Sequence, residues 1–165
     1  MRWPDFEFSQ DPITGTLRWK GPLRGFQRFY TIGIFYNPAV FDRPYVYLVT
    51  PSLTPRAGGT YAEIPHLIYD AENPESSGLC LFDPQGKEWS EGMLIADTTL
   101  PWAAKWLYYY ELWHYDGTWR GGGVGPESAA CARTEAVHSA ETEHTANPKG
   151  EASLALRQAV QDTLP

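Results

Sequence analysis

The residue with the clearest chemical potential in this chain is a cysteine set between two leucines. Cys80 belongs to the segment GLCLFDPQGKEW, residues 78–89. A thiol in such a position acts as a nucleophile, as a metal ligand or as a small apolar filler of the core, and core filling is the commonest fate. An irregular loop precedes Cys80 and a polar turn at 83–86 follows it, and reactive residues concentrate on loops held by a rigid scaffold. Alternation along the segment directs Leu79 and Leu81 one way and Cys80 the other way, toward the edge of a cleft.

The candidate base for this thiol is His66, in the segment IPHLIY. A histidine that contacts a cysteine sulfur takes its proton and leaves the more nucleophilic thiolate. The same context also suits a hydrogen-bonded structural histidine, so both roles stay open. A metal centre is disfavoured, because the spacing of the cysteines and histidines matches no zinc pattern. The residues concerned are His66, Cys80, Cys131, His138 and His144. We therefore expect neither a metal ion nor a cofactor.

The overall composition excludes several classes of protein. With 165 residues, 42% of them hydrophobic and 15% aromatic, the chain has enough apolar material for one packed domain. A net charge of -7 without a basic cluster argues against nucleic acid as the main ligand. No apolar run approaches the roughly 18 residues of a membrane span, and the N-terminus lacks the apolar region of a secretory signal. We therefore expect a cytoplasmic protein with reduced thiols.

The distribution of aromatic residues predicts where the domain ends. Every aromatic residue lies between Trp3 and Trp119, and after the glycine run at 121–123 the composition shifts to Ala, Glu, Thr, Ser and His. Such a segment has little to contribute to a core. We predict a folded domain at residues 1–125 and a low-complexity, flexible tail at 126–165. Cys131 belongs to that tail, and we expect it to be a bystander.

Three segments near the N-terminus have the β-branched and aromatic richness of strands: 15–23, 28–37 and 44–53. The short polar links between them predict an antiparallel meander. The third segment alternates, with Tyr45, Tyr47 and Val49 on one face and Val46 and Leu48 on the other. The following residues are rich in Gly and Pro, which predicts an irregular crossing with a short strand around residues 66–69.

Residues 92–117 contain the strongest helical pattern. Asp97, Thr98 and Thr99 supply capping groups, Pro101 suits a first turn, and Gly117 suits a stop. Aromatic residues recur at spacings of three and four, which predicts one aromatic face that covers the meander. These residues are Trp102, Trp106, Tyr109, Tyr110 and Trp113. The fold class is therefore α+β: an antiparallel β-meander with a covering aromatic helix.

The order of these features resembles the ubiquitin-conjugating enzyme fold, in which a His-Pro-Asn motif, a Cys-Leu pair and a tryptophan follow the strands. The chain is more similar still to the ubiquitin-conjugating-like proteins of type II (short) CBASS, the bacterial cyclic-oligonucleotide-based anti-phage signalling systems. The likeness covers about residues 16–123. The matching motifs are His66 with Tyr69, Leu79–Leu81, Glu88 with Trp89, the helical stretch from Thr98 to Trp113, and Gly117 to Gly121.

This resemblance implies that Cys80 is the nucleophile of an acyl carrier. Its sulfur would hold the C-terminal carboxyl of a partner, the CD-NTase (a cGAS-like nucleotidyltransferase), as a thioester and pass it to an acceptor. The Pro and Asn of the family motif are replaced by Leu67 and Ile68, so the usual oxyanion donor is missing. We expect Asn73 or backbone N–H groups near Gly78 to replace it. The sequence has no Gly-rich nucleotide loop, so another protein must activate the carboxyl.

Two rival functions remain open on the same fold. A non-catalytic binding module that docks and regulates the CD-NTase would explain the missing asparagine. A thiol hydrolase would use Cys80 together with His66.

Overall fold

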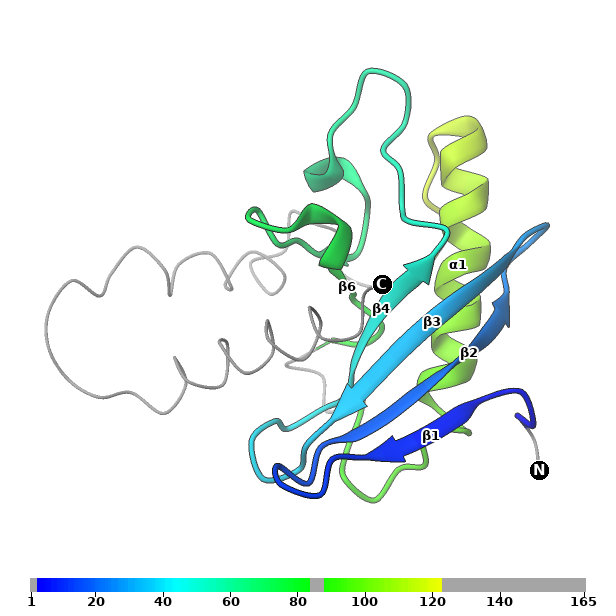
Figure 1. Ribbon diagram of the computed structural model, residues 1–165. Coiled ribbons are helices and arrows are strands. Elements are labelled where there is room, and N and C mark those ends of the chain that lie inside the picture. The colour runs from blue at the N-terminus through cyan, green and yellow to red at the C-terminus, as the bar shows by residue number, and fades with distance from the viewer. Residues whose placement is uncertain (1–2, 84–87, 123–165) are drawn as a thin grey trace, which may run out of the picture.

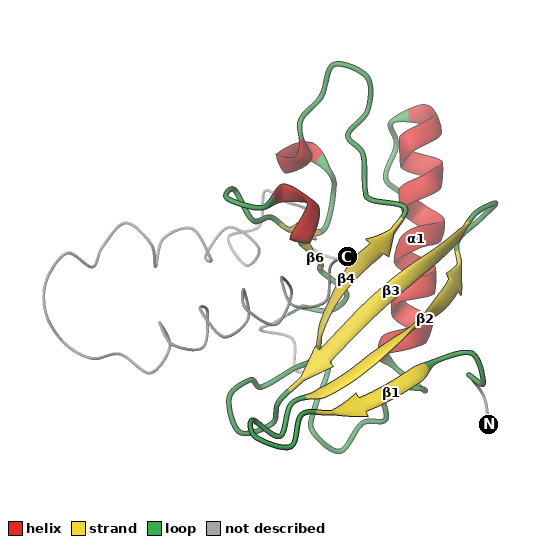
Figure 2. Ribbon diagram, viewed as in Figure 1, coloured by secondary structure: helices red, strands yellow, loops and turns green. Residues whose placement is uncertain are grey.

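The chain folds as an α+β domain in which one helix lies across one face of an antiparallel sheet (Figure 1). The computed structural model describes residues 3–83 and 88–122. Within those ranges the strands are β1 (Glu7–Gln10), β2 (Leu17–Arg24), β3 (Phe29–Tyr36), β4 (Tyr45–Thr50), β5 (Leu67–Ile68) and β6 (Gly78–Leu79). Two short 3-10 helices, η1 (Tyr61–Glu63) and η2 (Pro74–Ser76), precede the α-helix α1 (Thr99–Asp116) (Figure 2).

The strands form a sheet in the order β1-β2-β3-β4-β6-β5. The predicted meander is confirmed, since β2, β3 and β4 pair antiparallel in sequence order. The predicted short strand is β5. The sequence reasoning missed β1, which pairs with β2 through Glu7 opposite Lys20. All four residues of β1 are exposed, so this edge strand has no apolar alternation that a pattern search would find.

Alternation along β3 and β4 gives the sheet two apolar faces. Ile32, Ile34, Val46 and Leu48 belong to the main core, together with the buried side chains of α1. Phe35 and Tyr47 form a smaller cluster on the other face, with Tyr45 and Val49 packed against them. The predicted division of residues 45–49 between the two faces is therefore confirmed. Each fully buried aliphatic side chain in the main core stabilises the fold by about 1.5–3 kcal/mol.

The helix is confirmed, and its start agrees with the predicted capping residues. Residues 95–98 form a turn, and α1 begins at Thr99, so that Pro101 lies in its first turn. Thr98 occupies the N-cap position without a capping hydrogen bond, because its hydroxyl donates to the Leu94 carbonyl at 2.8 Å. Gly117 ends the helix in a left-handed conformation, as predicted. Trp106, Tyr110 and Trp113 are buried on the sheet side.

Candidate functional site

Pairing of two short strands brings His66 and Cys80 together. In β5 and β6, Leu67 lies opposite Leu79, so the residues that flank this pair face each other across the ladder. The Cys80 N–H donates to the His66 carbonyl at 2.9 Å. The strand β6 was not predicted. It attaches the Cys80 segment to the sheet through Gly78, which pairs with Tyr47 of β4.

Cys80 is half-buried at the end of β6. Its neighbour Leu79 belongs to the main core, and Leu81 packs against that core, so the predicted alternation holds. The sulfur lies 4.0 Å from the Phe82 carbonyl oxygen. Cys80 is therefore not a filler sealed in the apolar interior.

His66 is held by its backbone and by ring stacking. Its carbonyl also accepts a hydrogen bond from the buried indole N–H of Trp106, at 2.9 Å. Its ring stacks on Trp119, with centroids 5.2 Å apart and an interplanar angle of 24°. Burial lowers the pKa of His66 and so favours the neutral imidazole. Although both residues lie in the described part of the chain, the structure contains no hydrogen bond between this ring and the Cys80 sulfur.

Asn73 lies in the loop that leads to Cys80, at the N-cap of η2. Its backbone N–H donates to the Asp70 carboxylate at 3.0 Å, and its side chain makes no capping hydrogen bond. The loop is further anchored by the Ser77 hydroxyl, which accepts from the Asp70 N–H at 3.0 Å. The hydrogen bond to Asp70 fixes the backbone of Asn73, and no contact joins Asn73 to Cys80 among the described residues. Its role as an oxyanion donor stays a prediction.

Arg43 is a site residue that the sequence reasoning missed. It lies in the loop between β3 and β4, where it forms an ion pair with Asp42 at 2.6 Å. Its guanidinium carbon stands 5.9 Å from the centre of the Phe82 ring. The hydrogen bond that the Arg43 guanidinium donates to Asp42 raises the pKa of Arg43, and the electrostatic influence of Asp42, Cys80 and Asp83 adds to the rise. No local pattern around residue 43 indicates this role, because the loop approaches Phe82, two residues beyond Cys80, only in the fold.

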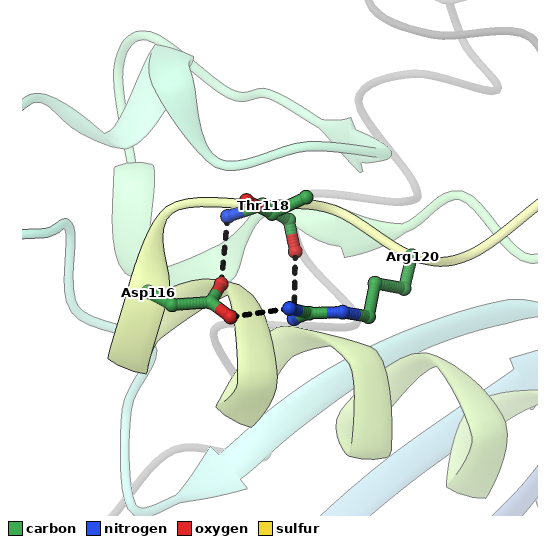
Figure 3. A network of polar contacts seen from close by, with 3 residues as sticks. All are labelled: Asp116, Thr118 and Arg120. Carbon is green, nitrogen blue, oxygen red and sulfur yellow. Dashed lines mark hydrogen bonds and ion pairs between the residues drawn. The ribbon is translucent and has the colours of Figure 1, made fainter.

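Beyond α1 the chain turns where Asp116, Thr118 and Arg120 are linked (Figure 3), and Trp119 in this segment stacks on His66. The Asp116 carboxylate accepts from the Thr118 N–H at 2.9 Å and from the Arg120 guanidinium at 2.5 Å. Trp119 then packs against Trp106, with ring centroids 5.7 Å apart. The Gly117–Gly121 motif therefore places an aromatic ring beside His66.

Away from Cys80, a concave feature lies between the β2–β3 turn and the C-terminal part of α1. It is a cavity of about 360 Å³ whose lining includes Tyr30, Tyr110, Glu111 and His114. The Glu111 carboxylate accepts the Gln27 N–H at 2.7 Å and fixes the turn. Two exposed rings, Phe26 and Tyr115, line this cavity, and the exposed Tyr108 packs against Phe26.

Neither a metal centre nor a membrane span is found in the part of the chain that the structure describes. Residues 3–83 and 88–122 contain no group of three or more His, Cys, Asp or Glu side chains arranged to hold a metal ion. The other residues weighed as ligands, Cys131, His138 and His144, lie outside the described residues, as does the predicted tail. No helix within the described ranges has both the length and the apolar character needed to cross a bilayer.

The fold and the site together define a class. An antiparallel meander, a covering helix and a half-buried cysteine beside the sheet are consistent with a ubiquitin-conjugating-like protein. The family model described as "Type II CBASS E2 protein" matches residues 1–126, and the chain belongs to this family. Membership implies an E2-like role in CBASS defence. No curated protein matches the chain.

Proposed function

We propose that Cys80 carries the C-terminal carboxyl of a partner CD-NTase as a thioester and transfers it to an acceptor. The observation that supports this most is the placement of Cys80: it is half-buried at the end of β6, and its backbone N–H is hydrogen-bonded to the His66 carbonyl. A nucleophile whose backbone is held in place and whose side chain is not sealed in the core meets the geometric requirement for acyl transfer.

The reaction has two displacement steps at one carbonyl carbon. In the first, the Cys80 thiolate attacks a C-terminal acyl group that another protein has activated as an acyl adenylate or a thioester. The C–S bond forms, and AMP or a thiolate leaves. In the second, an amine attacks the same carbon, the C–N bond forms and the C–S bond breaks. The Cys80 thiolate returns, and the proton of the amine passes to solvent.

Three neighbours are assigned supporting roles. The Arg43 guanidinium, which lies in the electrostatic field of Cys80, favours the charged form of a nearby thiol. Asn73 is retained as the donor to the oxyanion, and His66 as the base. Stacking on Trp119 holds the face of the His66 ring, and the lone pair that would accept the thiol proton lies in the plane of the ring.

Co-expression of the full-length protein with its CD-NTase tests this function. Intact-mass spectrometry under non-reducing conditions should show a covalent adduct with the wild-type protein and with Cys131→Ala, but none with Cys80→Ala. The Cys131→Ala variant is the matched control, because it removes the other thiol of the chain. Absence of the wild-type adduct, or its persistence in Cys80→Ala, would refute the proposal.

A non-catalytic docking module is the second candidate. The cavity of about 360 Å³ and the exposed Phe26 and Tyr115 rings beside it favour this function, since clustered exposed aromatic side chains are typical of protein contacts. On this alternative, Cys80→Ala would leave both complex formation and protection against phage unchanged. On the first proposal, it abolishes the adduct and reduces protection.

A further inference from the structure

We infer that Trp106 is a positioning residue for the Cys80 thiol, because its indole N–H and the Cys80 backbone N–H bind the same carbonyl oxygen, that of His66. The inference deepens the proposed function of Cys80. It concerns a structural link that can be measured without any acyl transfer.

The shared acceptor is the first step of the argument. Trp106 Nε1 and the Cys80 nitrogen each lie 2.9 Å from the His66 oxygen. A carbonyl oxygen has two lone pairs and accepts both donors. Trp106 is only 4% exposed, so water cannot readily replace its N–H when the indole is removed. A buried acceptor that loses one donor is destabilised, and its segment then shifts or admits water.

The backbone of His66 is the second step. His66 has φ +54°, the only positive value at a non-glycine residue in the described ranges. Side chains other than glycine are strained in this region, and such strain persists only where the surroundings enforce it. The left-handed conformation of His66 orients its carbonyl so that both the Trp106 indole N–H and the Cys80 N–H bind it. Trp106 therefore helps to maintain the conformation that presents the His66 carbonyl to Cys80.

The rigidity of Trp106 is the third step. Its ring stacks on Tyr110, with centroids 5.5 Å apart and an interplanar angle of 11°. The Tyr110 hydroxyl is fixed in turn by the backbone of Thr54, accepting its N–H at 2.9 Å and donating to its carbonyl at 3.0 Å. Trp119 packs on Trp106 and on the His66 ring. The helix α1 is thus linked to Cys80 in two steps: the Trp106 indole N–H binds the His66 carbonyl, and the same carbonyl accepts the Cys80 N–H.

Substitution of Trp106 by Phe tests the inference, because it keeps an aromatic ring and removes the donor. Trp113→Phe is the matched control: Trp113 is also buried on α1, and its ring contacts are with Tyr110 and His114. The readout is the hydrogen-exchange rate of the Cys80 amide, measured by NMR on the full-length protein. We expect exchange about tenfold faster in Trp106→Phe than in Trp113→Phe, relative to the amides of β3. Equal Cys80 exchange in the two variants would overturn the inference.

If Trp106→Phe does not fold, a second pair of variants tests whether the conformation of the His66 carbonyl holds the Cys80 amide. His66→Gly and His66→Ala both lack the imidazole, but only glycine adopts the left-handed conformation without strain. We expect the Cys80 amide to be better protected in His66→Gly, and equal or reversed protection would contradict the role of this carbonyl.

The adduct assay separates the two claims. If the exchange results hold but wild-type protein forms no adduct, the proposed function fails and the structural link stands. If the adduct forms and Trp106→Phe alters neither Cys80 exchange nor the rate of loading, the positioning role fails alone. The expected loss of loading rate is about tenfold, at unchanged affinity for the CD-NTase.

Discussion

At the scale of single residues, His66 is a buried group whose ring packs on Trp119 while its carbonyl binds two donors. The neutral imidazole suits this environment, because the charged form would lose its hydration on burial. The structure thus links His66 to Cys80 through the main chain, whereas the sequence had left both a base and a structural residue open.

The lowered pKa of His66 makes stability depend on pH in a defined direction. The unfolded chain, with an ordinary pKa near 6.5, binds a proton at a higher pH than the folded chain does. The contribution of His66 to stability is therefore complete above about pH 6.5 and declines as the pH falls below it. Urea denaturation should show that the difference in free energy of unfolding between wild type and His66→Phe shrinks from pH 7.5 to pH 5. A difference that stays constant would contradict the assigned burial.

Arg43 is expected to assist Cys80 through its charge. We expect Arg43→Gln to slow alkylation of Cys80 by iodoacetamide at pH 7 by about threefold, a modest factor because the half-exposed guanidinium is partly screened by water and salt. Arg24→Gln is the control, since Arg24 packs over Phe29 in another part of the sheet. Both variants are measured in the Cys131→Ala background. Equal alkylation rates of Cys80 in Arg43→Gln and Arg24→Gln would show that Arg43 does not assist the thiol.

The residues of the site differ in how far the sequence could predict them. Cys80 was found because its alternation with Leu79 and Leu81 is a local pattern, and local patterns survive folding. Arg43 and Trp119 could not be assigned their roles, because each meets the Cys80 region only through the sheet or through the turn after α1. Contacts between segments distant in sequence carry no local signal.

At the scale of elements, the end of α1 determines where the chain turns back toward His66. Gly117 has φ +83° and donates its N–H to the Trp113 carbonyl at 2.7 Å. A guanidinium nitrogen of Arg56 occupies the space that a methyl group at residue 117 would need. Asp116 and Arg120 then fix the following turn (Figure 3).

Three glycine variants should separate these effects in thermal unfolding. Gly117→Ala should lower the free energy of unfolding by about 1–2 kcal/mol, because alanine is strained in the left-handed conformation. Displacement of the Arg56 guanidinium should lower it further. Gly58 also has a positive φ but open space around it, so Gly58→Ala should lower the free energy of unfolding only by the cost of the left-handed backbone. Gly92→Ala has neither feature and should be close to neutral. Equal stability of Gly117→Ala and Gly92→Ala would show that the cap is unimportant.

Among the elements, the sequence pattern predicted those with a strong apolar period and missed those without one. The strands β2, β3 and β4 and the helix α1 have buried faces, so their periods could be read directly. The start of α1 at Thr99 agrees with the capping groups predicted at Asp97, Thr98 and Thr99, and Thr98 hydrogen-bonds to Leu94 in the turn before it. The strand β1 is exposed, and β6 is only two residues long.

At the scale of the whole molecule, a single core joins the sheet to the helix. It draws buried residues from β2 through β6 and from α1, from Leu23 to Trp113, while Trp3 and Trp119 pack against it. The family match to residues 1–126 has nearly the same extent as the domain predicted at 1–125. That domain boundary remains a prediction, because the residues after 122 lie outside the described part.

Truncation tests the boundary. We expect residues 1–126 to unfold cooperatively with a midpoint within about 2 °C of the full chain, because the core found among the described residues runs from Leu23 to Trp113. A markedly lower midpoint, or loss of cooperativity, would show that the tail contributes to the core.

The measurement that tests the central claim most directly is the chemical identity of the bond at residue 80. In Cys80→Ser co-expressed with the CD-NTase, a hydroxyl replaces the thiol, and the acyl group should be trapped as an ester. Peptide mass spectrometry should locate the CD-NTase C-terminus on residue 80 in both proteins. Excess thiol should release it from wild type only, and mild base should release it from both. A linkage at any other residue, or a wild-type linkage that resists thiol, would contradict the account.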